Sequence, residues 1–176
     1  MLNLTKQETT VGRTARTWRS HIPDGPITGV LVGLCGTKGS GLRFGNAAEL
    51  HRYADDGIVI LLPDPNPNVA QGQWVAHGPA EIAFLSKMIE QTQAMCATEL
   101  PRAVWLGWSA GAGMCYSLWQ DRPDLVGGIA VIGLSPHTGL ADPPYAPARP
   151  VYIQMGTEDK TGHYRPTDDR LGLIDH

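Results

Sequence analysis

The sequence has little of several features that would assign it to a specialised class of protein. Charge of one sign is scarce, because 14 lysines and arginines stand against 17 aspartates and glutamates, for a net charge of −3. This balance predicts neither a nucleic acid nor a membrane as partner. No apolar run reaches membrane-spanning length, and the first residues lack the basic start and apolar core of a signal peptide. We therefore expect a cytoplasmic protein, or a secreted one if the N-terminus is incomplete.

Cysteine is rare as well. The three cysteines, Cys35, Cys96 and Cys115, cannot all pair, and none has the C-x-x-C spacing of a metal site. We expect three buried, free thiols in a reducing compartment. We also expect no metal ion and no cofactor.

Apolar residues, by contrast, make up 42 % of the 176 residues, and glycine and proline are abundant. This length predicts a single domain over residues 1–176 with a buried core. Apolar runs alternate with helical patterns, which is typical of an α/β fold with a mostly parallel central sheet flanked by helices. The expected strands are 14–22, 28–34, 58–62, 103–106, 128–134 and 150–155. The expected helices are 47–54 with Asn46 as N-cap, one that begins at Pro79, and 111–120.

The most informative segment is Gly107-Trp108-Ser109-Ala110-Gly111, which lies between an expected strand and an expected helix. In this G-x-S-x-G context the serine occupies a sharp, strained turn that presents its hydroxyl at the edge of the sheet. The glycines remove Cβ atoms that would collide where strand and helix approach each other. The pattern predicts that Ser109 is a nucleophile.

A nucleophilic serine needs a histidine to take its proton and usually a carboxylate to orient that histidine. Asp159 directly follows the last expected strand, so it faces the same sheet edge as Ser109, and Glu158 is the neighbouring alternative. The chain order Ser…Asp…His leaves His163 or His176 as the base. The third option is that the base is absent from this chain, because His163 is close to the acid and His176 is the last residue.

The oxyanion that forms during attack needs two backbone amides. Ala110 is expected to give one, and Cys35 or Thr37, after the second expected strand, the other. The alternative role for this glycine-rich loop is a nucleotide cradle. That motif is not matched, because Lys38 is followed by Gly39 where G-x-x-x-x-G-K-[ST] needs serine or threonine.

Two long loops, 63–78 and 136–150, are expected to shape the pocket. His77 and His137 lie on these loops and could border it. Structural or solvent-facing roles are expected for the remaining two histidines, His21 and His51.

Three segments resemble one family. Residues 107–114 resemble the serine turn of the α/β-hydrolases, specifically that of the poly(3-hydroxybutyrate) depolymerase and feruloyl esterase branch. Residues 119–130 look like the helix end and next strand of that branch, and residues 155–159 look like its His-Gly-Thr-x-Asp segment. The resemblance covers about residues 13–162. It implies the α/β-hydrolase fold, a serine esterase activity and Asp159 as the acid.

The sequence departs from this branch at two places. The branch often has His-Gly after its oxyanion strand, where this chain has Cys35-Gly36. Members also continue past the acid with a helix, a strand and the histidine loop, whereas 17 residues follow Asp159 here. The chain is therefore expected to lack the final strand and helix, either because it is incomplete or because it is a reduced form. An unpaired edge strand would then favour self-association.

These observations predict a serine hydrolase that cleaves small-molecule or polymeric carboxylic esters through an acyl-enzyme at Ser109. The polyester depolymerase and the feruloyl or acetyl esterase are the types the resemblance implies. Two alternatives stay open: a serine peptidase or acyltransferase on the same scaffold, and a non-catalytic binding module derived from it.

Overall fold

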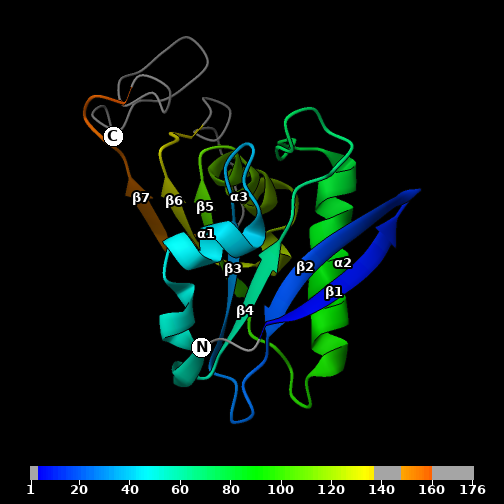
Figure 1. The fold of residues 1–176 in the computed structure, drawn as a ribbon. Helices are drawn as coiled ribbons and strands as arrows, with labels where there is room; N and C mark the ends of the chain where they lie inside the picture. The colour runs from blue at the N-terminus through cyan, green and yellow to red at the C-terminus, as the bar shows by residue number, and fades with distance from the viewer. Residues whose placement is uncertain (1–3, 137–147, 160–176) are drawn as a thin grey trace.

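The computed structural model describes residues 4–136 and 148–159, which form a sheet with helices on both faces (Figure 1). The described strands are β1 (Thr5–Val11), β2 (Thr14–His21), β3 (Gly29–Leu34), β4 (Ile58–Pro63), β5 (Ala103–Trp108), β6 (Val126–Ile132) and β7 (Val151–Gln154). The α-helices are α1 (Gly41–Ala47), α2 (Pro79–Met95) and α3 (Ala110–Asp121), and two 3-10 helices are η1 (Leu50–Asp56) and η2 (Pro123–Leu125).

The seven described strands lie in the order β1-β2-β4-β3-β5-β6-β7. Strands β3 to β7 pair in parallel, and β1 and β2 are antiparallel to their neighbours. The expected mostly parallel α/β sheet is thus confirmed. Strand β1 was not expected, because its sequence TKQETTV has no apolar alternation. It forms because it pairs along its whole length with β2.

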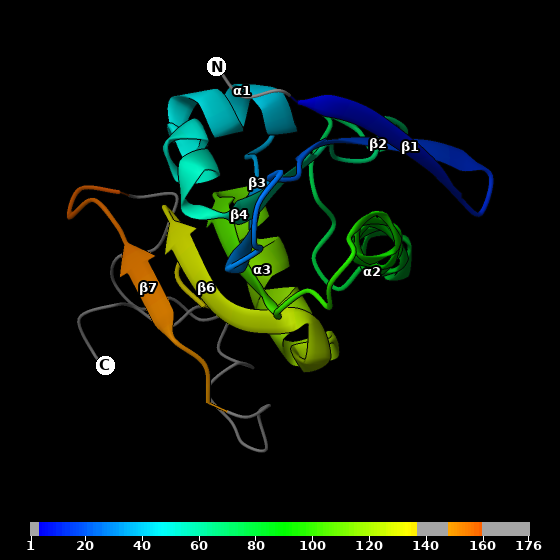
Figure 2. The ribbon, with the colours of Figure 1, turned by 90° about the horizontal axis from the view of Figure 1, so that it is seen from below.

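The alternating side chains of β4 show how the sheet divides the core. Val59 and Leu61 belong to the large cluster with residues of α2 and α3, and Ile60 and Leu62 belong to a smaller cluster with Leu50 of η1. Successive strand residues point to opposite faces. The larger helices accordingly cover one face, and α1 and η1 cover part of the other (Figure 2).

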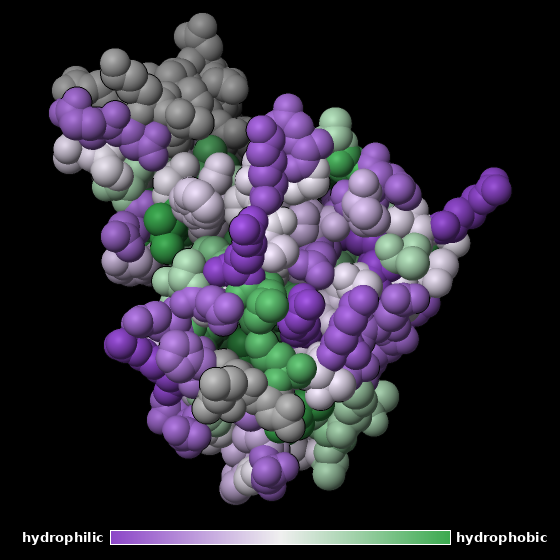
Figure 3. Space-filling view, viewed as in Figure 1, coloured by the Kyte–Doolittle hydropathy of each residue, from purple (hydrophilic) through white to green (hydrophobic). Residues whose placement is uncertain are grey.

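Apolar residues gather on the face that carries α1 and η1 (Figure 3). A hollow of about 590 Å³ on this face is lined by residues that include Leu31, Val104 and Tyr152. Tyr152 belongs to β7, which is the last strand at its edge of the described sheet. Self-association through this edge stays a prediction.

The expected helix 47–54 is wrong. Helix α1 ends at Ala47, Asn46 lies inside it, and its N-cap is Ser40, whose hydroxyl accepts from the Arg43 amide at 3.4 Å. Glu49 then adopts a left-handed φ of +52°, so the chain continues as the 3-10 helix η1. Helix α1 begins at a glycine because a Cβ at Gly41 would collide with the Leu62 carbonyl. Close packing here overrides helix propensity.

Helix α2 begins at Pro79, as predicted, and buries Leu85 and Met88. It also buries Glu81, whose carboxylate lies 2.7 Å from the Arg16 guanidinium of β2. This ion pair fixes the β1–β2 hairpin to the helix. Among the described residues, no helix combines the length and apolar character needed to cross a membrane.

Candidate active site

Ser109 lies at the turn between β5 and α3 with φ +54° and ψ −117°. A non-glycine residue with positive φ is strained and persists where its surroundings fix it. Two hydrogen bonds fix this one: the Ser109 amide donates to the Ile132 carbonyl at 2.9 Å, and the Ser109 carbonyl accepts from the Gly113 amide at 3.2 Å. Ser109 is half-buried. The structure therefore has the sharp strand-to-helix turn that the motif predicts.

Two glycines make this turn possible. A Cβ at Gly107 would collide with the Gly111 carbonyl, and a Cβ at Gly111 would collide with the Leu34 carbonyl at the end of β3. The obstacles are backbone atoms, so no rotamer change would relieve them. Strand β5, helix α3 and the end of β3 therefore meet directly below Ser109.

The loop that follows β3 passes directly beside Ser109. At Gly36, a Cβ would lie 3.4 Å from the Ser109 Cβ and 3.1 Å from the Trp108 ring. Cys35 and Thr37 flank this glycine. No local pattern predicts the contact of Gly36 with Ser109, because the two residues lie more than 70 positions apart in the chain.

The structure thus brings the expected oxyanion donors near the serine. Ala110 is the first residue of α3, and amides in the first turn of a helix have no acceptor within it. Gly36 brings the backbone of the Cys35–Thr37 segment close to Ser109.

The Cys35 side chain is almost fully buried, at 1 % exposure. Burial, and to a lesser degree the Asp64 charge, raises the pKa of its thiol to about 11, although a hydrogen bond with the Trp74 indole partly opposes both effects. Cys35 is therefore a neutral thiol at physiological pH, and its backbone is the part that the site can use. All three cysteines are free, but Cys96 is only partly buried, so the expectation of three buried thiols is wrong for Cys96.

Asp159 follows β7 at the same sheet edge. Its amide donates to the Gly156 carbonyl at 3.0 Å, and its side chain is half-buried, whereas Glu158 is exposed. A Cβ at Gly133 would lie 3.7 Å from the Asp159 Oδ2 and 3.5 Å from the Trp108 Nε1. Gly133 follows Ile132, the residue that binds the Ser109 amide. This placement favours Asp159 over Glu158.

The two expected bases, His163 and His176, lie outside the described residues, and so does His137. His21 is in β2 and half-buried, and exposed His51 is in η1. The structure leaves the choice of base open.

His77 lies elsewhere than expected. Its Nδ1 is 2.9 Å from the Asp121 Oδ2, and its amide donates to the Ser117 hydroxyl at 3.0 Å. Asp121 is the last residue of the 12-residue helix α3, and a helix of that length rises about 18 Å. His77 is therefore at the opposite end of α3 from Ser109.

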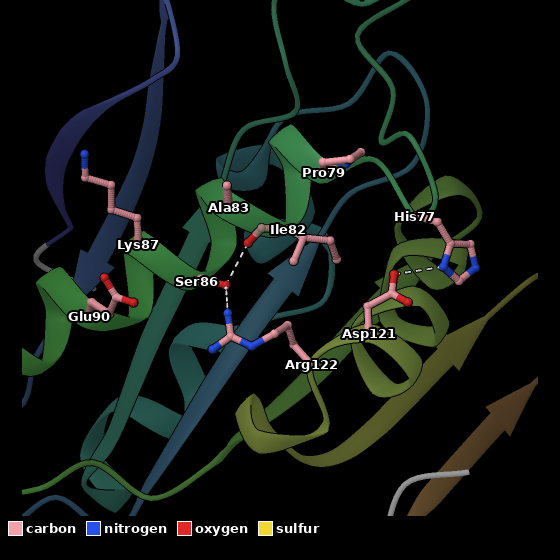
Figure 4. Close-up of a pocket in the computed structure, with 9 residues that line it drawn as sticks. All are labelled: His77, Pro79, Ile82, Ala83, Ser86, Lys87, Glu90, Asp121 and Arg122. Carbon is pink, nitrogen blue, oxygen red and sulfur yellow. Dashed lines mark hydrogen bonds and ion pairs between the residues drawn. The ribbon is translucent and has the colours of Figure 1, made fainter. Parts of the chain in front are cut away.

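A surface cavity of about 730 Å³ adjoins this histidine (Figure 4). It lies between α2 and the end of α3, and Ser86 and Arg122 contact each other across it at 2.6 Å. Its lining includes neither Ser109 nor Asp159. Within residues 4–136 and 148–159, no group of three or more histidine, cysteine, aspartate or glutamate side chains could hold a metal ion.

No known family model matches the chain, and no curated protein sequence does. Solved structures are similar to it. A thermostable esterase has a TM-score of 0.69 at 13 % identity over 91 % of this chain and 48 % of its own. An acetyl xylan esterase from Aspergillus awamori has a TM-score of 0.58 at 15 % identity, and the match covers 72 % of this chain and 51 % of the esterase. An α/β hydrolase from Novosphingobium aromaticivorans has a TM-score of 0.53 at 18 % identity, and the match covers 74 % of this chain and 44 % of the hydrolase.

The chain spans about half the length of these solved structures. Identities this low establish the shared fold alone. The mostly parallel sheet with helices on both faces (Figure 1) agrees with that likeness. The described chain has the α/β-hydrolase fold.

Proposed function

We propose that the protein is a carboxylic ester hydrolase whose nucleophile is Ser109. One observation carries the proposal: a non-glycine residue is held at φ +54° between a parallel strand and a helix, beside two glycines whose Cβ atoms would collide with backbone atoms. Strain at such a position is typical of functional sites.

Each neighbouring element has a role in the proposed reaction. The Ser109 Oγ attacks the ester carbonyl carbon while a histidine, His163 or His176, takes its proton. Asp159 orients that histidine and stabilises its charged form. The amide of Ala110 and an amide of the Cys35–Thr37 loop stabilise the oxyanion.

The tetrahedral intermediate collapses when the histidine returns the proton to the leaving alcohol, and an acyl-enzyme forms. Water then attacks the acyl carbon, with the same histidine as base, and releases the acid and Ser109. No step needs a cofactor.

The activities of the structural neighbours support an ester as substrate. They include an acetyl xylan esterase and a ferulic acid esterase. Together with the resemblance at residues 107–114, they favour a feruloyl or acetyl esterase or a polyester depolymerase over a peptidase.

The turnover of p-nitrophenyl acetate by the wild type and Ser109→Ala tests the proposal. We expect Ser109→Ala to lower kcat at least about a thousandfold, because the members of a triad act as a unit. Ser117→Ala is the matched control, since Ser117 is a buried serine of the same helix. Turnover that survives in Ser109→Ala would contradict the proposal. A folded wild type without turnover would favour the binding module.

A further inference from the structure

Asp64 lies directly after β4, at the sheet edge that carries Ser109, and the chain holds it firmly. Its amide donates to the Thr17 carbonyl at 3.0 Å, and its carbonyl accepts from the Arg16 guanidinium at 3.3 Å. Its carboxylate is three-quarters buried, with Arg19 at 3.8 Å.

The two carboxylate oxygens of Asp64 join two elements. Oδ2 accepts from the Thr17 hydroxyl of β2 at 3.0 Å. Oδ1 accepts from the Gly41 amide at 2.9 Å. Gly41 is the first residue of α1, so the carboxylate supplies an acceptor that the helix itself does not provide there.

Gly41 also ends the segment that passes Ser109. We call residues 35–40 the oxyanion loop. Its first residues leave β3 beside Ser109, and its last residue, Ser40, caps α1. Between these ends the Gly39 amide donates to the Gly36 carbonyl and the Lys38 amide donates to the Gln71 carbonyl, each at 3.0 Å. The Asp64–Gly41 hydrogen bond is therefore the attachment of the far end of this loop.

The charge of Asp64 also acts on the near end of the loop, because it helps to raise the pKa of the Cys35 thiol. The carboxylate thus lies close to both ends of the loop. Among the described residues, no hydrogen bond or ion pair joins it to Ser109 or Ala110, so we expect any effect on the reaction to act through the loop.

We propose that Asp64 is a positioning residue that holds the oxyanion loop against Ser109. The inference rests on the proposed function. An oxyanion donor works only within hydrogen-bond distance of the oxygen that becomes charged, and complete loss of one donor lowers kcat by about 10²–10³. When Asp64 no longer holds Gly41, the loop shifts and part of this stabilisation is lost.

The test compares Asp64→Ala with Asp64→Asn. The alanine removes both acceptors, and we expect kcat for p-nitrophenyl acetate to fall about tenfold to a hundredfold with KM almost unchanged. The asparagine keeps an oxygen for the Gly41 amide, so it should restore kcat to within about threefold of the wild type. Asp124→Asn is the matched control, because Asp124 pairs with Arg122 beyond the far end of α3.

Amide hydrogen exchange supplies a readout that does not depend on turnover. We expect residues 36–41 to exchange faster in Asp64→Ala, and to exchange at the wild-type rate in Asp64→Asn and Asp124→Asn. If Asp64→Ala does not fold, Asp64→Ser replaces it, because its shorter side chain cannot reach Gly41.

Three results would overturn the inference: wild-type kcat in folded Asp64→Ala, unchanged exchange in residues 36–41, or equal losses of kcat in the alanine and asparagine variants. A wild type without turnover would instead contradict the proposed function. Exchange alone would then decide whether Asp64 holds the loop.

Discussion

The two ends of helix α3 carry similar chemical groups in very different settings. At its start, Ser109 is strained, half-buried and placed at the edge where parallel strands end. At its end, Asp121 pairs with His77 at 2.9 Å, with side chains 35 % and 45 % exposed. The second end has the histidine–carboxylate pair that a serine nucleophile needs, but about 18 Å of helix separates it from Ser109.

The difference shows that residue types alone do not identify the site. A positive φ does not distinguish the two ends, because Ser109 and His77 both have φ +54°. The Ser109 end is distinguished by its turn between a parallel strand and a helix, and by glycines whose Cβ would collide with backbone atoms. The His77 end is an ion pair on a surface cavity that holds a loop against the helix. The predictions below separate the two ends, starting with the largest effect.

Gly111→Ala should destabilise the protein by about 3 kcal/mol, because its Cβ would overlap the Leu34 carbonyl and the backbone must move. Gly113→Ala, two residues on, is the matched control. A Cβ there would lie 3.4 Å from the nearest Leu134 methyl, so the change should be neutral or slightly stabilising. Urea denaturation measures both. Equal stability of the two variants would show that the close approach below Ser109 is absent.

Alkaline pH should weaken the fold through the buried thiols. Burial raises the pKa of Cys35 from 9.0 to about 11 and that of Cys115 higher still, each chiefly by desolvation. The folded state therefore favours the neutral thiol. The contribution of the neutral thiol to the free energy of unfolding is complete below pH 9 and is lost as pH rises through 11. Urea midpoints between pH 8 and 11 measure the loss.

Cys35→Ala and Cys115→Ala should each flatten that pH dependence, and partly exposed Cys96 supplies the control, Cys96→Ala. A slope equal to that of the wild type in Cys35→Ala would contradict the burial of this thiol at the start of the oxyanion loop.

His77→Gln should cost less than about 1 kcal/mol in unfolding free energy, because an ion pair this exposed contributes little. It should leave the kcat for p-nitrophenyl acetate unchanged. A large loss of turnover would make the His77 end part of the site, and would contradict the conclusion that only the Ser109 end of α3 takes part in the reaction. Asp121→Asn, on the same pair, should behave in the same way.

The smallest effect on stability should come from breaking the Arg122–Asp124 ion pair near the His77 end. The hydrogen bond from Arg122 holds the pKa of the Asp124 carboxyl below its ordinary value of 3.8. Its contribution to stability is present above pH 3.8 and is lost as pH falls through the lowered pKa. Because Asp124 is well exposed, Asp124→Asn should change acid unfolding only slightly, as measured by circular dichroism between pH 2 and 5.

Local patterns predicted much of the fold. Buried runs such as Ile58–Pro63 are apolar throughout, which predicts a strand. The turn between β5 and α3 is predicted by one short motif, G-x-S-x-G. Prediction failed where contacts between residues far apart in the chain determine whether a strand forms or where a helix begins. Strand β1 forms by pairing with β2, and α1 begins at Gly41 because α1 packs closely on β4.

The same contrast holds for the candidate site. Ser109 and Asp159 could be named from sequence because Ser109 directly follows β5 and Asp159 lies in the short loop after β7. The contact of Gly36 with Ser109 and the role of Asp64 could not be predicted, because only the folded chain brings these residues to Ser109 and Gly41. His77 lies on a loop, and no local pattern shows which end of α3 that loop reaches.

The most direct test of the account is to label the folded protein with a fluorophosphonate and to map the adduct by peptide mass spectrometry. We predict one adduct, on the peptide that carries Ser109, which is lost in Ser109→Ala and kept in His77→Gln. Absence of any adduct in folded protein, or an adduct on a residue other than Ser109, would contradict the assignment of Ser109 as the nucleophile.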